Sequence, residues 1–374
     1  MPLASPPSAP ASHFPALDGL RAVAVLLVLY DHAPQVLGRD RGAMHWLWHG
    51  SAGAWIGVDL FFVLSGFLIT TILLRARGQD GAFSRFWLRR ALRIFPLAAV
   101  YLVVLAGCAL LLPGFEHLRE PAQYGFAAGY LTNVHVAWFG WSAAAFGILW
   151  SLSVEEHFYL GWPLLALRMA RRTLGGLLLA VVLVVPCLRA WLLPEVGPVH
   201  VYVATWCRCD TLAWGSLLAL AFDSPWRDAV LRLGRWLWLP ATVWLVVVLA
   251  MPFEAVGPTT PAWFFVVGYS AIALAFASWC AVAIAPPRGG RWLGHRGLAG
   301  IGRISYGLYV WHVLAAEVTT GLLAWAGAAT TLEARSVVWL VVLAMGASAS
   351  HRWLEAPCLR WKDRVGGTVA LPGA

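Results

Sequence analysis

The stretch LDGLRAVAVLLVLYDHAPQVL, residues 17–37, decides the fold. About 20 apolar residues at roughly 1.5 Å each cross the hydrocarbon core of a bilayer, so this run is long enough for a transmembrane helix. It nevertheless contains Arg21 and His32, which helical geometry places on nearly the same face and about 16 Å apart in depth. An arginine at the centre of such a helix costs roughly 2.5 kcal/mol or more. Snorkelling to the interface explains Arg21 but not His32, so the run indicates a function inside the membrane.

The composition extends this picture to the whole chain. Apolar residues make up 60% of the 374 residues and charged residues only 12%, against about 25% charged residues in a soluble domain. The mean hydropathy is +0.71. We therefore expect an all-α, polytopic bundle of membrane helices. The net charge of +9 is then explained by basic loops at one membrane face, and no nucleic-acid partner is expected.

Apolar runs of sufficient length predict about ten transmembrane helices. The runs fall at 17–37, 54–74, 96–112, 148–167, 173–193, 203–222, 236–253, 263–285, 305–325 and 334–356. If the N-terminus is inside, the loops rich in arginine all face the cytoplasm, as the positive-inside rule requires. These loops lie at 75–93, 168–172, 227–235, 288–303 and 352–364. Both the N- and C-termini are therefore predicted to be cytoplasmic.

Charge also decides how an eleventh apolar stretch, 124–141, is placed. A full crossing there would move every later basic cluster to the outer side, against the positive-inside rule. We expect instead an outer-face or re-entrant element packed against protein. At the ends of the chain, residues 1–13 are rich in Pro, Ala and Ser and are predicted to be disordered, and residues 363–374 are predicted to form a cytoplasmic tail.

The second run contains GVDLFFVLSGFLIT, residues 57–70, with a carboxylate near its outer end. The small residues Gly57, Ser65 and Gly66 permit close approach of another helix. Asp59 is explained equally well by a packing seam at the interface and by a polar site.

An arginine-rich segment follows this run, FWLRRALRIFP at residues 86–96. Arg89 and Arg93 are four residues apart and share one helical face, with Arg90 between them. Planar guanidinium groups are well suited to phosphate. The alternative is a topology-setting anchor on anionic lipid.

Two adjacent carboxylates stand inside another apolar run, LWSLSVEEHFYLGWPLL at residues 149–165. Glu155 and Glu156 point about 100° apart on a helix, so at least one should face a polar cavity or a basic partner such as Arg208. Arg208 and Asp210 together suggest a structural salt bridge within the membrane.

Polar residues also mark the ends of the last two runs, in SYGLYVWH (305–312) and HRWLEAPCLRW (351–361). An interfacial belt explains the aromatic residues of both segments, but it does not readily explain His312 or Glu355. The six cysteines show no CxxC or Cys/His spacing, so no metal site is expected.

These segments together resemble the membrane-bound acyltransferase 3 family, the bacterial O-acyltransferases of surface sugars, lipopolysaccharide and some antibiotics. The resemblance covers residues 16–360 and places an acyltransferase 3 transmembrane domain at about 14–362. It rests on LDGLRAVAVLLVLYDH with its Arg-x10-His spacing, GVDLFFVLSGFLIT, FWLRRALRIFPL, LWSLSVEEHFYLGWPLL, RCDTLAWGSLLAL, IGRISYGLYVWH and HRWLEAP, in that order. Two positions depart from the family pattern: His157, where Gln is common, and Ala356, where a basic residue is common.

The resemblance implies transfer of an acyl group, with acetyl expected, from cytoplasmic acyl-CoA. It also implies a central catalytic histidine at His32, with the arginine of the same motif at Arg21. We predict catalytic roles for His32, Glu155 and Glu156, and substrate-binding roles for Arg21, Asp59, Arg89, Arg90, Arg93, His312 and Glu355.

A neutral His32 would act either as general base on an acceptor hydroxyl or as nucleophile through an acyl-imidazole. Asp31 points about 100° away from it on a helix, so Glu155 or Glu156 is as plausible an orienting partner. The resemblance leaves a glycan, a lipid-linked sugar, peptidoglycan or a macrolide-type hydroxyl open as the acceptor, and no bound cofactor is expected to be required. A multi-pass protein in contact with lipid of the bacterial inner membrane is expected. The alternatives are a transporter or flippase, whose repeat symmetry the sequence does not show, and a scaffold, which needs no ionisable groups within its spans.

Overall fold

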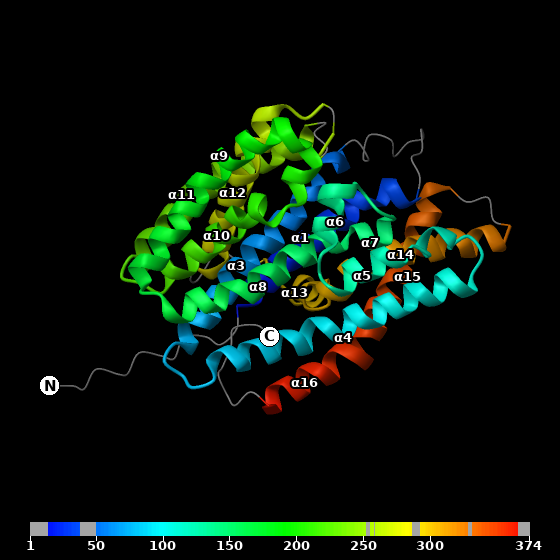
Figure 1. Cartoon of the computed structure of the whole chain (residues 1–374), viewed down its shortest axis with the longest axis horizontal. Coiled ribbons are helices and arrows are strands. Elements are labelled where there is room, and N and C mark those ends of the chain that lie inside the picture. The colour runs from blue at the N-terminus through cyan, green and yellow to red at the C-terminus, as the bar shows by residue number, and fades with distance from the viewer. Residues whose placement is uncertain are drawn as a thin grey trace.

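The structure, a computed structural model, describes residues 14–37, 50–251, 255–257, 259–285, 292–327 and 331–365. Within these ranges the chain forms helices and no strands, which confirms the predicted all-α class (Figure 1). The predicted disordered segment 1–13 and residues 366–374 of the predicted tail lie outside the described residues.

The long helices form the body of the bundle. They are α1 (Pro15–Leu37), α3 (Gly57–Ala76), α4 (Ala82–Leu111), α8 (Leu149–Arg168), α9 (Arg171–Val203), α10 (Thr205–Phe222), α11 (Arg227–Ala250), α12 (Tyr269–Ile284), α14 (Ser305–Trp325) and α15 (Leu332–Ser350). The shorter elements are η1 (Gly50–Ile56), η2 (Glu116–Leu118), α5 (Pro121–Ala128), α6 (Thr132–Phe139), α7 (Ala144–Gly147), η3 (Phe264–Gly268), α13 (Arg296–Arg303), η4 (His351–Glu355) and α16 (Ala356–Val365).

Seven helices among the described residues are long and apolar enough to cross a membrane, so the chain is a multi-pass membrane protein. They are Ser51–Ala76, Ala82–Leu111, Arg171–Val203, Arg227–Ala250, Phe264–Ile284, Ser305–Trp325 and Glu333–Trp361. The other three predicted spans correspond to α1, α8 and α10, which have 23, 20 and 18 residues and each carry several ionisable side chains. The predicted total of about ten would require these three helices to cross the membrane in addition to the seven.

Helix α3 lies at the centre of the bundle because small residues let its neighbours approach closely. A Cβ on Gly66 would lie 2.0 Å from the carbonyl oxygen of Leu212 on α10, and one on Gly215 would lie 2.0 Å from that of Val63 on α3. Gly57 meets α1 in the same way, at 2.5 Å from the carbonyl oxygen of Ala24. The predicted packing role of Gly57 and Gly66 is confirmed.

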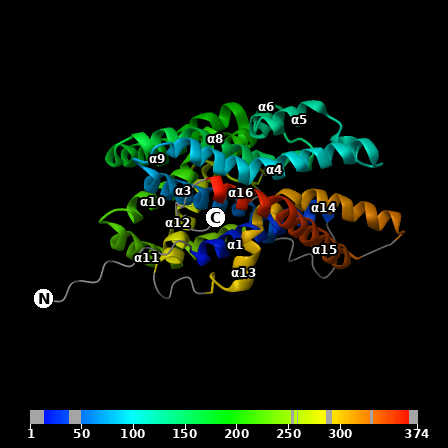
Figure 2. The same ribbon diagram turned by 90° about the horizontal axis from the view of Figure 1, so that it is seen from below.

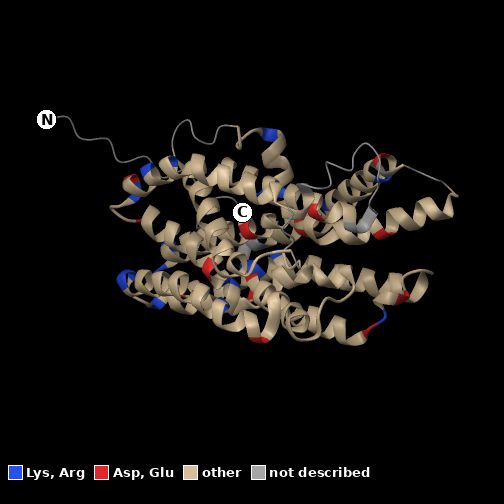
Figure 3. Ribbon diagram, turned by 90° about the horizontal axis from the view of Figure 1, so that it is seen from above, with Lys and Arg blue, Asp and Glu red and all other residues tan. Residues whose placement is uncertain are grey.

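The layers are seen most easily from below (Figure 2). Helices α4, α5, α6, α8 and α9 lie on one side, α1, α11 and α13 lie on the other, and α3 and α10 lie between them. Charged positions occur at helix ends and also within the centre of the bundle (Figure 3). The side chains that could act inside the membrane therefore come from the middle of this arrangement.

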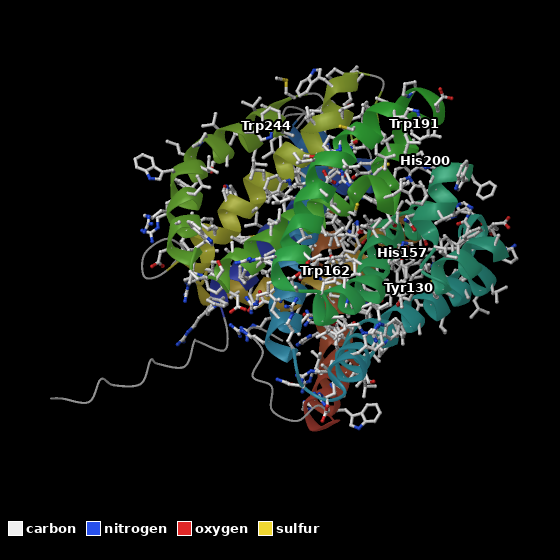
Figure 4. The ribbon with its side chains drawn as sticks, turned by 60° about the vertical axis from the view of Figure 1, so that its left-hand side comes forward. Tyr130, His157, Trp162, Trp191, His200 and Trp244 are labelled. Carbon is white, nitrogen blue, oxygen red and sulfur yellow. The ribbon has the colours of Figure 1, made fainter. Side chains whose placement is uncertain are left out.

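The 124–141 stretch does not form a single helix, as expected. Helices α5 and α6 have eight residues each and meet at Tyr130, whose positive φ of 53° turns the chain sharply. The ring of Tyr130 stacks on the ring of Phe95, with 5.4 Å between the centroids. Phe95 lies about 20 Å along α4 from Ala82, the first residue of that helix. His157 of α8 is hydrogen-bonded to the Tyr130 backbone and, through Nδ1, to Thr205 Oγ1 at 2.7 Å (Figure 4). The family departure at His157 is thus a side chain that ties the turn to α8 and α10.

Candidate functional site

A cavity of about 100 Å³ opens between α1, α3, α4, α8 and α14. Along α3 its lining extends from Ile69 to Val58, about 16 Å. It contains three arginines and a single carboxylate, so its charge favours an anion. The lining residues are Arg21, Val58, Phe61, Phe62, Ser65, Leu68, Ile69, Arg90, Arg93, Ile94, Ser151, Leu152, Glu155, Tyr159, Ser305, Tyr306 and Tyr309.

The arginines reach the cavity from two helices. Arg21 of α1 donates from Nη1 to Asp18 Oδ1, one turn earlier on the same helix, at 3.2 Å. The guanidinium of Arg90 on α4 lies over the ring of Tyr159, 5.5 Å from its centroid. Arg93 is the third, whereas Arg89 is not part of the lining. The pair on the cavity is therefore Arg90 and Arg93, three residues apart, and not the Arg89 and Arg93 pair expected from the i, i+4 spacing.

The single carboxylate of the lining is held by two hydroxyl groups. Ser65 donates from Oγ to Glu155 Oε1 at 2.6 Å, and Tyr159 donates from its hydroxyl to Glu155 Oε2 at 3.1 Å. The two hydroxyl oxygens lie 3.0 Å apart. Sequence reasoning assigned Ser65 to packing and did not name Tyr159. The position of Tyr159, four residues after Glu155 on one helix, was the available signal.

Glu156 points elsewhere, as adjacent positions on a helix require. It does not line the cavity, and its buried Oε1 has no hydrogen-bond partner among the described residues. Glu355 also lies outside the lining. It accepts from Ser350 Oγ at 3.1 Å, and its Oε1 would lie 3.1 Å from a Cβ on Gly307 of α14.

Tyr309 closes the cavity on the side of α14. Its hydroxyl donates to the carbonyl oxygen of Ile148 at 2.7 Å and lies 2.6 Å from Ser151 Oγ. Its ring contacts Phe61 edge-on at 6.2 Å and His312 at 5.7 Å between centroids. Tyr309 and Ser151 were not predicted as site residues, and they connect the cavity to the predicted histidines.

His32 and His312 are brought together from α1 and α14. Their ring centroids lie 4.8 Å apart, with the planes at 79°. His32 Nδ1 lies 3.0 Å from the carbonyl oxygen of Val28, and His312 Nδ1 lies 2.5 Å from that of Tyr309. A carbonyl oxygen can only accept, so each Nδ1 carries the hydrogen and each neutral ring has its lone pair on Nε2.

The partner of His32 Nδ1 is thus a backbone carbonyl, and this nitrogen does not bind Glu155 or Glu156, which the sequence had left open as orienting partners. Glu155 is engaged by Ser65 and Tyr159. Asp31 Oδ2 lies 3.6 Å from His32 Nδ1, too far for a good hydrogen bond. His32 is not part of the cavity lining. It is connected to the cavity through ring contacts, since Tyr309 of the lining contacts His312 and His312 contacts His32.

Four further charged side chains within the helices form two buried ion pairs, whose partners differ from the expectation. Arg208 donates from Nη2 to Asp59 Oδ1 at 2.5 Å. Arg189 binds both carboxylate oxygens of Asp210 at 3.0 Å. All four side chains are fully buried. The predicted pair of Arg208 with Asp210 is wrong because residues two apart on a helix point to nearly opposite sides.

Asp59 therefore lies in an ion pair and not on the cavity. A group of three or more His, Cys, Asp or Glu side chains that could hold a metal ion does not occur in the part of the chain that the structure describes.

Comparisons with known proteins agree on one family. A family model described as an acyltransferase domain matches residues 14–350. The chain is 33% identical over 231 residues to the peptidoglycan O-acetyltransferase OatA of Listeria monocytogenes, and 33% identical over 228 residues to the putative peptidoglycan O-acetyltransferase YrhL of Bacillus subtilis. Each match covers 56% of this chain, but only 34% and 33% of those relatives' own lengths. No solved structure matches the chain significantly.

Proposed function

Because the chain belongs to the acyltransferase family whose model spans residues 14–350, we propose that it is a membrane O-acyltransferase. It moves an acyl group, most simply acetyl, from cytoplasmic acyl-CoA to a hydroxyl of a glycan. The observation that carries this proposal is the cavity between α1, α3, α4, α8 and α14, which has three arginines in its wall and a histidine pair beyond Tyr309.

The arginines suit the donor. Arg21, Arg90 and Arg93 present three guanidinium groups to one cavity, and the Arg21 guanidinium also pairs with the carboxylate of Asp18. Guanidinium forks bind phosphate oxygens in two-point contacts. The phosphates of acyl-CoA are held by these groups, and the thioester extends along α3 towards Tyr309 and the histidines.

His32 is the reacting residue. Its Nε2 lone pair takes the proton of the acceptor hydroxyl, and the hydroxyl oxygen attacks the thioester carbonyl carbon. The carbon–sulfur bond breaks, the acyl group remains on the acceptor oxygen, and the proton passes from His32 to the sulfur of free CoA. The Val28 carbonyl supports this step because it holds the hydrogen of neutral His32 on Nδ1 and leaves Nε2 free to accept.

The glycan acceptor is supported by the names of the relatives, two of which refer to peptidoglycan. A donor from the cytoplasm and an acceptor at the outer face require a protein that crosses the bacterial inner membrane. We propose ten spans with both termini in the cytoplasm, made of the seven apolar helices and of α1, α8 and α10.

The test uses the full-length protein in membranes, incubated with radiolabelled acetyl-CoA and peptidoglycan glycan strands. Label should appear on the glycan in a form that mild alkali releases, as an O-ester does. The matched variants are His32→Ala, which should abolish transfer, and His117→Ala, which changes an exposed histidine paired with Glu317 and should not. Ester formation that is equal in membranes with and without the protein would overturn the proposal.

A further inference from the structure

His312 is held more firmly than a packing residue requires. Its side chain is fully buried, and its Nδ1 donates to the Tyr309 carbonyl at 2.5 Å. Its own carbonyl oxygen accepts from Trp339 Nε1 of α15 at 2.9 Å. The ring is therefore fixed in position and in tautomer, at 4.8 Å from the ring of His32.

The other nitrogen of this ring is unsatisfied. His312 Nε2 is buried and has no hydrogen-bond partner among the described residues. A buried hydrogen-bond acceptor without a donor lowers the stability of the fold. If the hydrogen bond to Tyr309 were the only role of His312, an apolar group in place of Nε2 would cost no stability. An unsatisfied acceptor beside a reacting group is useful if that group becomes a cation during the reaction.

We propose that His312 is a positioning residue for His32, which fixes the His32 ring and presents its Nε2 lone pair to the positive charge that His32 carries after taking the acceptor proton. This inference rests on the proposed function. The proton enters at His32, its charge is stabilised by the adjacent neutral ring, and it leaves with the sulfur of CoA, so His312 gains and loses nothing over the cycle.

The carboxylate next to this pair does not replace His312. Asp31 Oδ2 lies 3.6 Å from His32 Nδ1, on the side of the ring that already binds Val28. Tyr309 of its own helix and Trp339 of α15 are hydrogen-bonded to His312, and both are uncharged. His312 is thus the group on α14 that is placed to stabilise a positive charge on the His32 ring.

Two substitutions separate this role from a structural one. His312→Asn places an amide nitrogen where Nδ1 stands, so it keeps the donor to the Tyr309 carbonyl and removes Nε2. His312→Gln places an amide group near Nε2 and removes the donor at Nδ1. A structural role predicts that the Asn variant has the higher kcat, whereas our inference predicts that the Gln variant does.

The measurement is kcat and KM for acetyl-CoA per folded molecule, with thermal stability followed in the same detergent. We expect the Asn variant to lose about 10- to 100-fold in kcat, the value of a hydrogen bond to a charged group. Its KM should be unchanged, because His312 does not line the cavity. An Asn variant with wild-type kcat, or with a higher kcat than the Gln variant, would overturn the inference alone. A wild-type protein that transfers no acyl group would overturn the proposed function and the inference with it.

Discussion

Neighbouring arginines on α4 provide a sharp test of the donor site. Arg90 and Arg93 line the cavity, whereas Arg89 lies one position away and does not. We predict that Arg90→Gln and Arg93→Gln each raise the KM for acetyl-CoA by about 10- to 100-fold, because each removes a charge-assisted hydrogen bond worth about 1.5–3 kcal/mol. The kcat should stay within about threefold, since a contact made equally before and during the reaction affects binding alone.

Arg89→Gln is the matched control because it removes the same charge from the same turn of the helix. Its KM should change by about threefold at most, the effect of an arginine that attracts the donor only through its distant charge. The assay is the initial rate of radiolabel transfer from acetyl-CoA in membranes over a range of donor concentrations. If the three variants raise KM equally, the arginines act as a diffuse positive face and not as ligands of the donor.

Three further predictions concern the bundle and the cavity wall. Gly66→Ala should lower the melting temperature markedly, because its Cβ would lie 2.0 Å from a carbonyl oxygen of α10, whereas Gly107→Ala, with nothing within 4 Å, should leave it unchanged or raise it. Asp210→Asn should destabilise the protein by about 3–5 kcal/mol, as expected for a broken buried ion pair. Asp223→Asn breaks a half-exposed pair with Arg171 and should cost about 1 kcal/mol or less. Denaturant titration in detergent compares the stabilities of the two variants. Ser65→Ala removes a donor to Glu155 and should lower kcat/KM about five- to tenfold without unfolding the protein, and an unchanged kcat/KM would remove that carboxylate from the site.

Local pattern was sufficient for much of the fold. Long apolar runs predicted the helices. The spacing of basic loops led us to expect that 124–141 does not cross the membrane, and the structure divides this stretch between the short helices α5 and α6. The glycines of the second run predicted a close helix contact. The partner helix could not be predicted, because Gly66 and Leu212 are brought together only by the folded bundle.

Contacts between residues on different helices could not be predicted from the sequence, and the site depends on such contacts. His32 and His312 were each identifiable as ionisable residues within apolar runs, but their contact joins positions 280 residues apart. The ion pair of Arg208 with Asp59 was missed for the same reason, since spacing along one helix offered Asp210 instead. Tyr309 and Ser151 escaped notice because aromatic and hydroxyl residues are common at span ends, and only their mutual hydrogen bond distinguishes them.

The central claim is that His32 Nε2 carries the proton during acyl transfer, and His32→Gln tests it most directly. Glutamine keeps a polar group of similar reach but cannot take up a proton at neutral pH. We predict that kcat for transfer from acetyl-CoA falls by about 10²- to 10⁴-fold, the usual contribution of a general base, while the KM for acetyl-CoA is retained. A His32→Gln protein with a kcat within about tenfold of the wild-type value would contradict the account.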